Sequence, residues 1–193
     1  MQLTQRQAQI LETAVEIIAE HGIQELTIKR LSGRIGVSEP ALYRHFTSKH
    51  AILEAILERF AGSAAETLAQ IADSELSPPD KLRAVFLRFT ERFTESPAVS
   101  AVVFAEEIFK NERVLSDWVM QIMHSAESRL RLILSAGVES GVFRDDVPLD
   151  HLTLVFLGSL RLLVTRWRLR GYDFNLREEG AALVESVLPT LSA

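Results

Sequence analysis

Residues 26–49 read LTIKRLSGRIGVSEPALYRHFTSK, and this stretch decides the fold. Thr27 is a residue type that caps helix N-termini, and apolar side chains recur at helical spacing over residues 28–35. Gly36 follows where a helix would end in a left-handed turn, a conformation that glycine adopts without steric cost. The pattern predicts a short helix that ends sharply.

A second short helix is expected after the turn. Ser38 is its cap, and Pro40 lies in its first turn, where the missing N–H group costs nothing. With Leu42 and Phe46 on its buried face, this helix is only about two turns long and too short to be stable alone. It must pack on neighbouring helices and expose its other face. We interpret residues 27–46 as a helix-turn-helix whose second helix enters the major groove of DNA.

The rest of the chain also has helical periodicity, and no segment has the alternation of a strand. We predict an all-α fold of about nine helices, in which a three-helix DNA-binding head is joined through a long fourth helix to a helical ligand-binding and dimerisation bundle. The head is assigned to residues 1–47 and the remaining domain to residues 48–193. The other expected helices are 4–21, 48–72, 79–95, one that begins at Ser96 with Phe104 and Ile108 facing inward, 112–140, 150–170 and 175–191.

Composition and charge restrict the class of protein. The hydrophobic fraction of 47% is typical of a globular chain, and the absence of cysteine excludes disulfides and zinc–thiolate sites. No apolar run resembles a signal sequence or a membrane span, so we expect a cytoplasmic protein. The net charge is −5, yet residues 27–49 carry five basic side chains against Glu39 alone, whereas residues 51–193 carry 15 against 21 acidic ones. A basic head on an acidic body fits binding to DNA.

The same stretch resembles the tetracycline-repressor (TetR) family of transcriptional regulators. GVS at 36–38, LYRHF at 42–46 and SK at 48–49 match the signature of that family without gaps, and the resemblance covers about the first 60 residues. The later residues are similar in the number and length of their helices and in the two apolar helices at the end. The resemblance implies a homodimeric repressor that binds a near-palindromic DNA operator and is released by a small, hydrophobic effector.

The resemblance also implies roles for single residues of the head. Lys49 lies near a helix N-terminus, which combines its charge with free backbone N–H groups and suits a phosphate. The positions that commonly hold phosphates are matched by Thr27, Tyr43, His45 and Lys49. The positions nearest to the base edges are matched by Lys29, Glu39, Pro40, Ala41 and Arg44, with Ser38 as the cap that precedes them.

Three of these residues have a second interpretation that the sequence leaves open. Glu39 could accept a hydrogen bond from a cytosine amine, or it could repel phosphates and only complement the helix dipole. Tyr43 could be mainly a core residue that exposes only its hydroxyl group. Arg44 could be a solvated arginine without a base contact, although its place in the second helix favours DNA.

Specific binding to an operator requires two heads at a half-site spacing of about 34–36 Å, so we expect a dimer. The last two helices are apolar on wide faces and, as the resemblance implies, would form a four-helix bundle across a two-fold axis. The alternative is that these faces complete the core of a single chain. The predicted interface residues are Val155, Ser159, Leu162, Leu163, Trp167, Leu183, Val184, Val187, Leu188 and Leu191.

The helices in the middle of the chain are expected to enclose an effector site, since ligands of helical bundles bind between helices. Glu107 and His124 are too few to form a metal site, so we predict no metal and no cofactor. As the resemblance implies, the effector would shift the population towards a form whose heads no longer match the operator. The predicted lining residues are Phe86, Phe89, Phe93, Phe104, Glu107, Trp118, Met123 and His124.

An enzyme is not predicted. The chain has no phosphate-binding glycine loop and no His-Glu-x-x-His pair, and GVESG at 137–141 does not place serine centrally as a nucleophile elbow requires. Two alternatives remain: a helical small-molecule-binding protein that does not bind DNA, and an activator of the same architecture. Arg44 and Lys49 argue against the first, and the sequence does not decide on the second.

Overall fold

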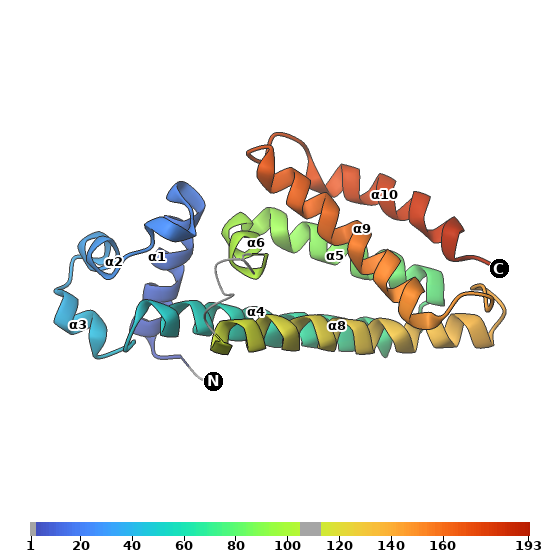
Figure 1. Ribbon diagram of the computed structural model, residues 1–193, viewed down its shortest axis with the longest axis horizontal. Coiled ribbons are helices and arrows are strands. Elements are labelled where there is room, and N and C mark those ends of the chain that lie inside the picture. Colours follow the sequence, from blue (N-terminus) through green and yellow to red (C-terminus); the bar gives the residue numbers. More distant parts are fainter. Residues whose placement is uncertain (1–2, 105–112) are drawn as a thin grey trace. The chain divides into compact units, whose positions relative to one another are not determined.

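The structure is a computed structural model that describes residues 3–104 and 113–193. Within these ranges it contains nine α-helices and one 3-10 turn and no β-strand, which confirms the all-α prediction (Figure 1). In chain order the elements are α1 (Gln5–His21), η1 (Ile23–Glu25), α2 (Ile28–Ile35), α3 (Glu39–Tyr43), α4 (Lys49–Ala72), α5 (Pro78–Glu95), α6 (Pro97–Val103), α8 (Arg113–Glu139), α9 (Leu149–Leu169) and α10 (Leu176–Leu191).

The helices group into two compact units. Unit 1 consists of Met1–Ala61 and Pro97–Met120, and unit 2 of Gly62–Ser96 and Gln121–Ala193. This grouping differs from the predicted boundary after residue 47, because α6 and the first turns of α8 belong with the head. The physical reason is apolar packing: α6 packs on α1 and buries Ala98 and Val102, which are at most 1% exposed. The sequence pattern of α6 does not tell which helix it covers.

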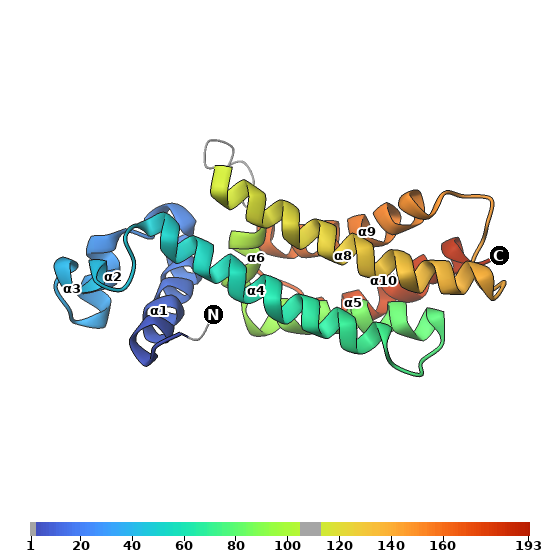
Figure 2. The same ribbon diagram turned by 90° about the horizontal axis from the view of Figure 1, so that it is seen from below.

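Unit 1 is organised around α1, which begins at a capping box. The Thr4 hydroxyl accepts from the Gln7 backbone N–H at 3.2 Å, and the Gln7 side chain accepts from the Thr4 backbone N–H at 3.0 Å. α2 packs on α1 and α3 packs on α2, an arrangement that Figure 2 shows from below. The buried face of α1 consists of Ile10, Leu11, Ala14, Ile17 and Ile18.

Unit 2 depends on the close approach of α5 and α10. Gly180 of α10 lies against the buried Thr90 of α5, and a Cβ atom at position 180 would lie only 2.6 Å from Thr90 Cγ2. α9 packs on both helices, and its Phe156 meets Phe86 of α5 edge to face with ring centroids 5.6 Å apart. The absence of a side chain at Gly180 therefore allows the two helices to approach each other this closely.

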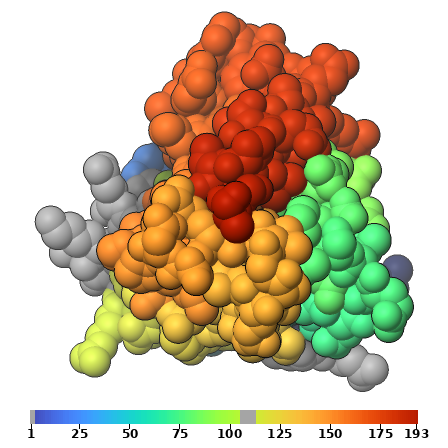
Figure 3. Space-filling model, turned by 90° about the vertical axis from the view of Figure 1, so that its right-hand side faces the viewer, coloured from blue at the N-terminus to red at the C-terminus, as the bar shows by residue number. Residues whose placement is uncertain are grey.

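The end of α10 is tied to the segment that follows α8. The Arg144 backbone N–H donates to the Leu191 carbonyl at 3.0 Å. Phe143 is 1% exposed and its ring lies on Gly137, where a Cβ atom would overlap the ring at 2.0 Å. Figure 3 shows the last turn of α10 (red) lying over this yellow-orange segment.

The predicted helix limits agree with the structure to within about two residues, with two exceptions. α3 ends at Tyr43, so Phe46, which was predicted on its buried face, follows the helix and is buried from outside it. α6 ends at Val103, so Phe104 follows the helix instead of lying within it, and Ile108 lies outside the described residues. None of the helices in the described part of the chain is long and apolar enough to cross a membrane.

The contact between Gly180 and Thr90 can be tested by substitution. We expect Gly180→Ala to lower the free energy of unfolding by about 1–3 kcal/mol in urea, because the added methyl group overlaps Thr90 in a packed core. Adding Thr90→Ser, which removes the nearest methyl group, should recover part of this loss. Gly62→Ala is the control, since its Cβ meets nothing within 4 Å in α4 and should be neutral or stabilising. Equal losses at positions 180 and 62 would contradict this account.

Candidate nucleic-acid interface

The helix-turn-helix is held by its caps. Thr27 Oγ1 accepts from the backbone N–H three residues later at 3.2 Å, and Ser38 Oγ does the same at 3.4 Å. Between the two helices, Gly36 adopts φ 77° and ψ 34°, the left-handed conformation expected from the sequence. Its N–H donates to the Ser32 carbonyl at 3.0 Å, which ends α2.

The burial of one face of the motif determines which side chains of α3 are free. Leu31 and Leu42 are fully buried and Phe46 is 6% exposed. Tyr43 is 47% exposed, so its interpretation as a core residue is excluded. The outward face of the second helix and its C-terminal end consists of Glu39, Pro40, Tyr43 and Arg44, with Ala41 and His45 partly exposed.

Part of the basic charge of this region is neutralised inside unit 1. The Arg34 guanidinium donates to both carboxylate oxygens of Glu20 at 2.5 Å and lies 3.9 Å from Glu16. Arg30 pairs with Glu25 at 2.9 Å. The hydrogen bonds between Arg34 and Glu20 lower the pKa of Glu20 and raise that of Arg34. The basic excess of residues 27–49 is therefore offset by carboxylates that precede the motif in the sequence.

Lys29 and Arg44 differ from these arginines. Both side chains are exposed, and neither makes an ion pair with a residue that the structure describes. Thr27 is also exposed at the start of α2. Lys29 and Arg44 are thus cations of the motif that can bind an external anion without first breaking an ion pair within the described chain.

Lys49 has a structural contact that the sequence did not indicate. Its Nζ atom donates to the Ile23 carbonyl at 3.1 Å, which ties the first turn of α4 to η1. Partial burial lowers the pKa of the Lys49 ammonium group, and the Glu25 carboxylate opposes this shift. An ammonium group has three donors, so this bond leaves two of them for a phosphate.

Five of the predicted effector-site residues belong to unit 2, but they do not form one lining. Phe86, Phe89 and Phe93 of α5 are 0–9% exposed and lie in the core. Met123 is 37% exposed and His124 is also exposed, so both lie on the surface of α8. Met123 and His124 therefore do not lie in the core with the three phenylalanines, and the helical pattern did not show that this side of α8 is uncovered.

The other predicted effector-site residues lie elsewhere. Trp118 belongs to unit 1, where its indole Nε1–H donates to Glu54 Oε1 at 3.1 Å. Phe104 also belongs to unit 1 and is partly exposed. Glu107 lies outside the described residues.

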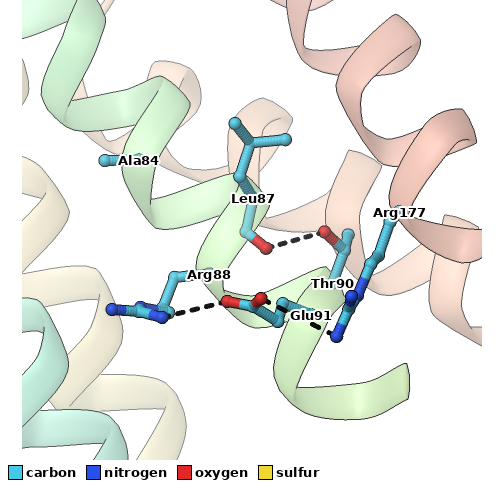
Figure 4. Close-up of a pocket in the computed structure, with 6 residues that line it drawn as sticks. All are labelled: Ala84, Leu87, Arg88, Thr90, Glu91 and Arg177. Atoms are coloured by element: carbon cyan, nitrogen blue, oxygen red, sulfur yellow. Dashed lines mark hydrogen bonds and ion pairs between the residues drawn. The ribbon is translucent and has the colours of Figure 1, made fainter. Parts of the chain in front are cut away.

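A shallow groove of about 330 Å³ lies between α5 and α10 in unit 2 (Figure 4). Glu91 accepts from Arg88 at 2.9 Å and lies 3.7 Å from Arg177, which also approaches Glu95 at 3.5 Å. The charges at this groove are thus paired with one another, and it contains none of the predicted effector-site residues. Its lining residues are Ala84, Leu87, Arg88, Thr90, Glu91 and Arg177.

The predicted dimer interface also needs correction. Of its members, Val155 is 52% and Leu162 62% exposed, and Ser159 and Leu183 are partly exposed. The remaining six are 0–8% exposed in the single chain, so a partner could bury almost nothing more of them. They complete the core of unit 2, as the alternative interpretation stated. These six residues are Leu163, Trp167, Val184, Val187, Leu188 and Leu191.

Further apolar residues of the same helix are exposed and were not predicted as interface residues from the sequence. Leu154 and Leu169 of α9 are 66% and 78% exposed. With Val155, Gly158 and Leu162 they follow one another at helical spacing and form a stripe along the outside of α9. α9 carries two apolar stripes, and periodicity alone does not show which of them faces inward.

This arrangement is that of a helix-turn-helix transcriptional regulator, and similarity to known proteins specifies the family. A family model described as bacterial regulatory proteins, tetR family, matches residues 10–56, and one described as tetracyclin repressor-like, C-terminal domain, matches residues 78–166. The chain belongs to the TetR family of bacterial transcriptional regulators.

Two relatives illustrate the similarity in sequence. The HTH-type transcriptional repressor KstR2 of Mycobacterium tuberculosis (strain ATCC 25618 / H37Rv) is 25% identical over 191 residues, which cover 97% of this chain and 93% of KstR2. The nucleoid occlusion factor SlmA of Vibrio campbellii is 32% identical over 136 residues, 68% of this chain and 67% of SlmA.

Solved structures agree in fold over almost the whole chain. The fatty acid degradation regulator FadR from Bacillus halodurans superposes with a TM-score of 0.85 at 18% identity, over 97% of each chain. The transcriptional regulator FadR from Bacillus subtilis, in complex with stearoyl-CoA, gives 0.79 at 22% identity, over 96% of this chain and 97% of that one. At sequence identities of 18% and 22%, these two superpositions show a shared fold and nothing more specific.

The pairing of Arg34 with Glu20 predicts a pH dependence. Because the pKa of Glu20 is lowered in the folded state, its carboxylate stabilises the fold above its ordinary pKa of 4.5, and this contribution is lost as the pH falls through the lowered value. We therefore expect Glu20→Gln to lower the melting temperature at neutral pH and to have a smaller effect in acid. Glu12→Gln, on the same helix, is the control and should show no such dependence. A constant effect of Glu20→Gln across this range would exclude the ion pair as its cause.

Proposed function

We propose that this regulator is a repressor that binds a near-palindromic operator as a homodimer, with α3 in the major groove. The observation that carries the proposal is the outward face of α3 together with Arg44, which directly follows this helix. Arg44 is exposed and makes no ion pair within the described residues, and the same holds for Lys29 of α2. Arg44 and Lys29 are assigned to base edges, together with Glu39, Pro40 and Ala41. Phosphate contacts are assigned to Thr27, Tyr43, His45 and the free donors of Lys49.

The dimer in this proposal is formed by the outer stripe of α9. Leu154, Val155, Leu162 and Leu169 are all more than half exposed in the single chain, and an apolar row of this length in water favours association. Gly158 in the same row allows a second helix to approach closely. On α10, the partly exposed Leu183 and the exposed Ala182, Ser186 and Pro189 would complete a four-helix bundle across the two-fold axis.

The effector of the proposed repressor is a small hydrophobic or amphipathic molecule, for which we favour an acyl compound. The structure of FadR from Bacillus subtilis contains stearoyl-CoA, and this chain shares its fold. Binding would favour a conformation in which the two heads no longer match the operator. The three buried phenylalanines of α5 would line such a site only if the ligand opens the core of unit 2.

Selection from a random duplex library at near-physiological salt tests this function. The expected result is an enriched near-palindrome whose half-site centres lie one helical turn or a small multiple apart. The selected duplex then allows effectors to be screened by release, with stearoyl-CoA compared with CoA alone. No enrichment, either before or after bound ligand is removed by denaturation and refolding, would contradict operator binding and favour a small-molecule-binding protein.

Arg44→Ala should weaken binding to the selected operator and relax base preference at one position. The expected cost is about 1–3 kcal/mol, the typical value for a specific base contact. Arg34→Ala is the matched control, because this arginine of the same motif is engaged with Glu20 and should affect stability instead of operator affinity. Measurement of Kd on the operator and on scrambled DNA separates the two effects. A loss for Arg44→Ala that is equal on both DNAs would remove its role in base reading.

Leu162→Glu should convert the dimer to a folded monomer. Leu162 is 62% exposed in the single chain, so the substitution places a charge in the interface without disturbing the core. Sedimentation gives the mass and circular dichroism the helicity, and operator binding should be lost with the dimer. Leu76→Glu, at a residue 46% exposed and outside the stripe, is the control. A dimer that survives Leu162→Glu would exclude the outer stripe of α9 as the interface.

A further inference from the structure

One hydrogen bond in unit 1 is not used by the DNA-binding face or by the proposed interface. The indole Nε1–H of Trp118 in α8 donates to Glu54 Oε1 in α4 at 3.1 Å, across 64 residues of sequence. Both side chains are partly buried. A hydrogen bond to a charged acceptor in a partly desolvated place is stronger than one at an open surface.

The hydrogen bond between Glu54 and Trp118 lies close to the helix-turn-helix in the chain. Glu54 lies five residues after Lys49, within the second turn of α4, which follows directly on the helix-turn-helix. Its neighbour Leu53 is 1% exposed, and Leu115 and Val119 beside Trp118 are 2% and 4% exposed. The bond therefore joins two helices that are both anchored in the core of unit 1.

Both helices continue beyond unit 1. The division between the units falls after Ala61 within α4 and after Met120 within α8. The Glu54–Trp118 bond thus connects the two long helices on the side where they belong with the DNA-binding motif. A shift of α4 along α8 within unit 1 would stretch this bond.

We propose that Glu54 and Trp118 are positioning residues for operator binding, whose hydrogen bond holds the start of α4, and with it α3, in the arrangement that fits DNA. The inference rests on the proposed function. Neither residue needs to contact DNA, because the bond acts by restricting the movement of α4 before binding. Pre-ordering of this kind raises affinity by reducing the fraction of unsuitable conformations.

The test measures Kd for the selected operator with variants that remove the donor or the acceptor. Trp118→Phe keeps an aromatic ring but removes the N–H group, and Glu54→Leu removes the acceptor. Each should raise Kd about three- to tenfold, the effect of one lost hydrogen bond. The double variant should be no weaker than either single variant, since both remove the same interaction. Glu54→Gln, which keeps a carbonyl acceptor, should bind nearly as the wild type does.

Two further measurements separate positioning from other roles. The slope of log Kd against log salt should stay unchanged, because no phosphate contact is removed. Trp167→Phe is a matched control: it removes an indole N–H that donates to the Phe174 carbonyl at 3.0 Å in unit 2, and should lower the melting temperature without raising Kd.

The outcomes distinguish this inference from the proposed function. If the wild-type protein selects no operator, the proposed function is contradicted, and the inference, which depends on it, is contradicted as well. If the wild type binds and Trp118→Phe and Glu54→Leu lower only the melting temperature, the inference is overturned while the proposed function stands. Additive losses in the double variant, or equal losses for Trp167→Phe, would likewise overturn it.

Discussion

Helix α3 has only five residues, and this shortness is the constraint on which the head depends. A helix of one and a half turns has too few internal hydrogen bonds to form in water, so it must be held by its neighbours. The complete burial of Leu42 and the near-complete burial of Phe46 hold it in place, with the left-handed turn at Gly36 before it and the start of α4 after it. The same burial leaves the opposite face of α3 exposed.

The second constraint is electrostatic and acts within unit 1. Carboxylates of α1 and η1 neutralise Arg34 and Arg30, which tie these elements to α2. Surface ion pairs of this kind contribute little to stability, but they change which cations can bind an external anion. Lys29 and Arg44 remain exposed and make no ion pair with a residue that the structure describes. A count of basic residues along the motif therefore overestimates the charge that is free of ion pairs.

Packing also determines which helices share a compact unit with the helix-turn-helix. α6 joins this unit because it buries apolar side chains against α1, although some 50 residues separate it from the motif in sequence. The first turns of α8 are joined to α4 by the hydrogen bond between Trp118 and Glu54. In unit 2, the close contact of Gly180 with Thr90 draws α10 onto α5, and the inner stripe of α9 covers the same core. What remains outside on α9 is a second apolar stripe that is exposed in the single chain.

The sequence alone predicted the helices, their caps, the turn at Gly36 and the family, because these features depend on residues within a few positions of one another. It also identified the last two helices as apolar on wide faces. It could not predict that Lys49 bonds to the Ile23 carbonyl, that Arg34 pairs with Glu20, or that Trp167 belongs to the core while Leu162 is exposed. Those outcomes depend on contacts between residues distant in sequence, which form only when the helices pack together.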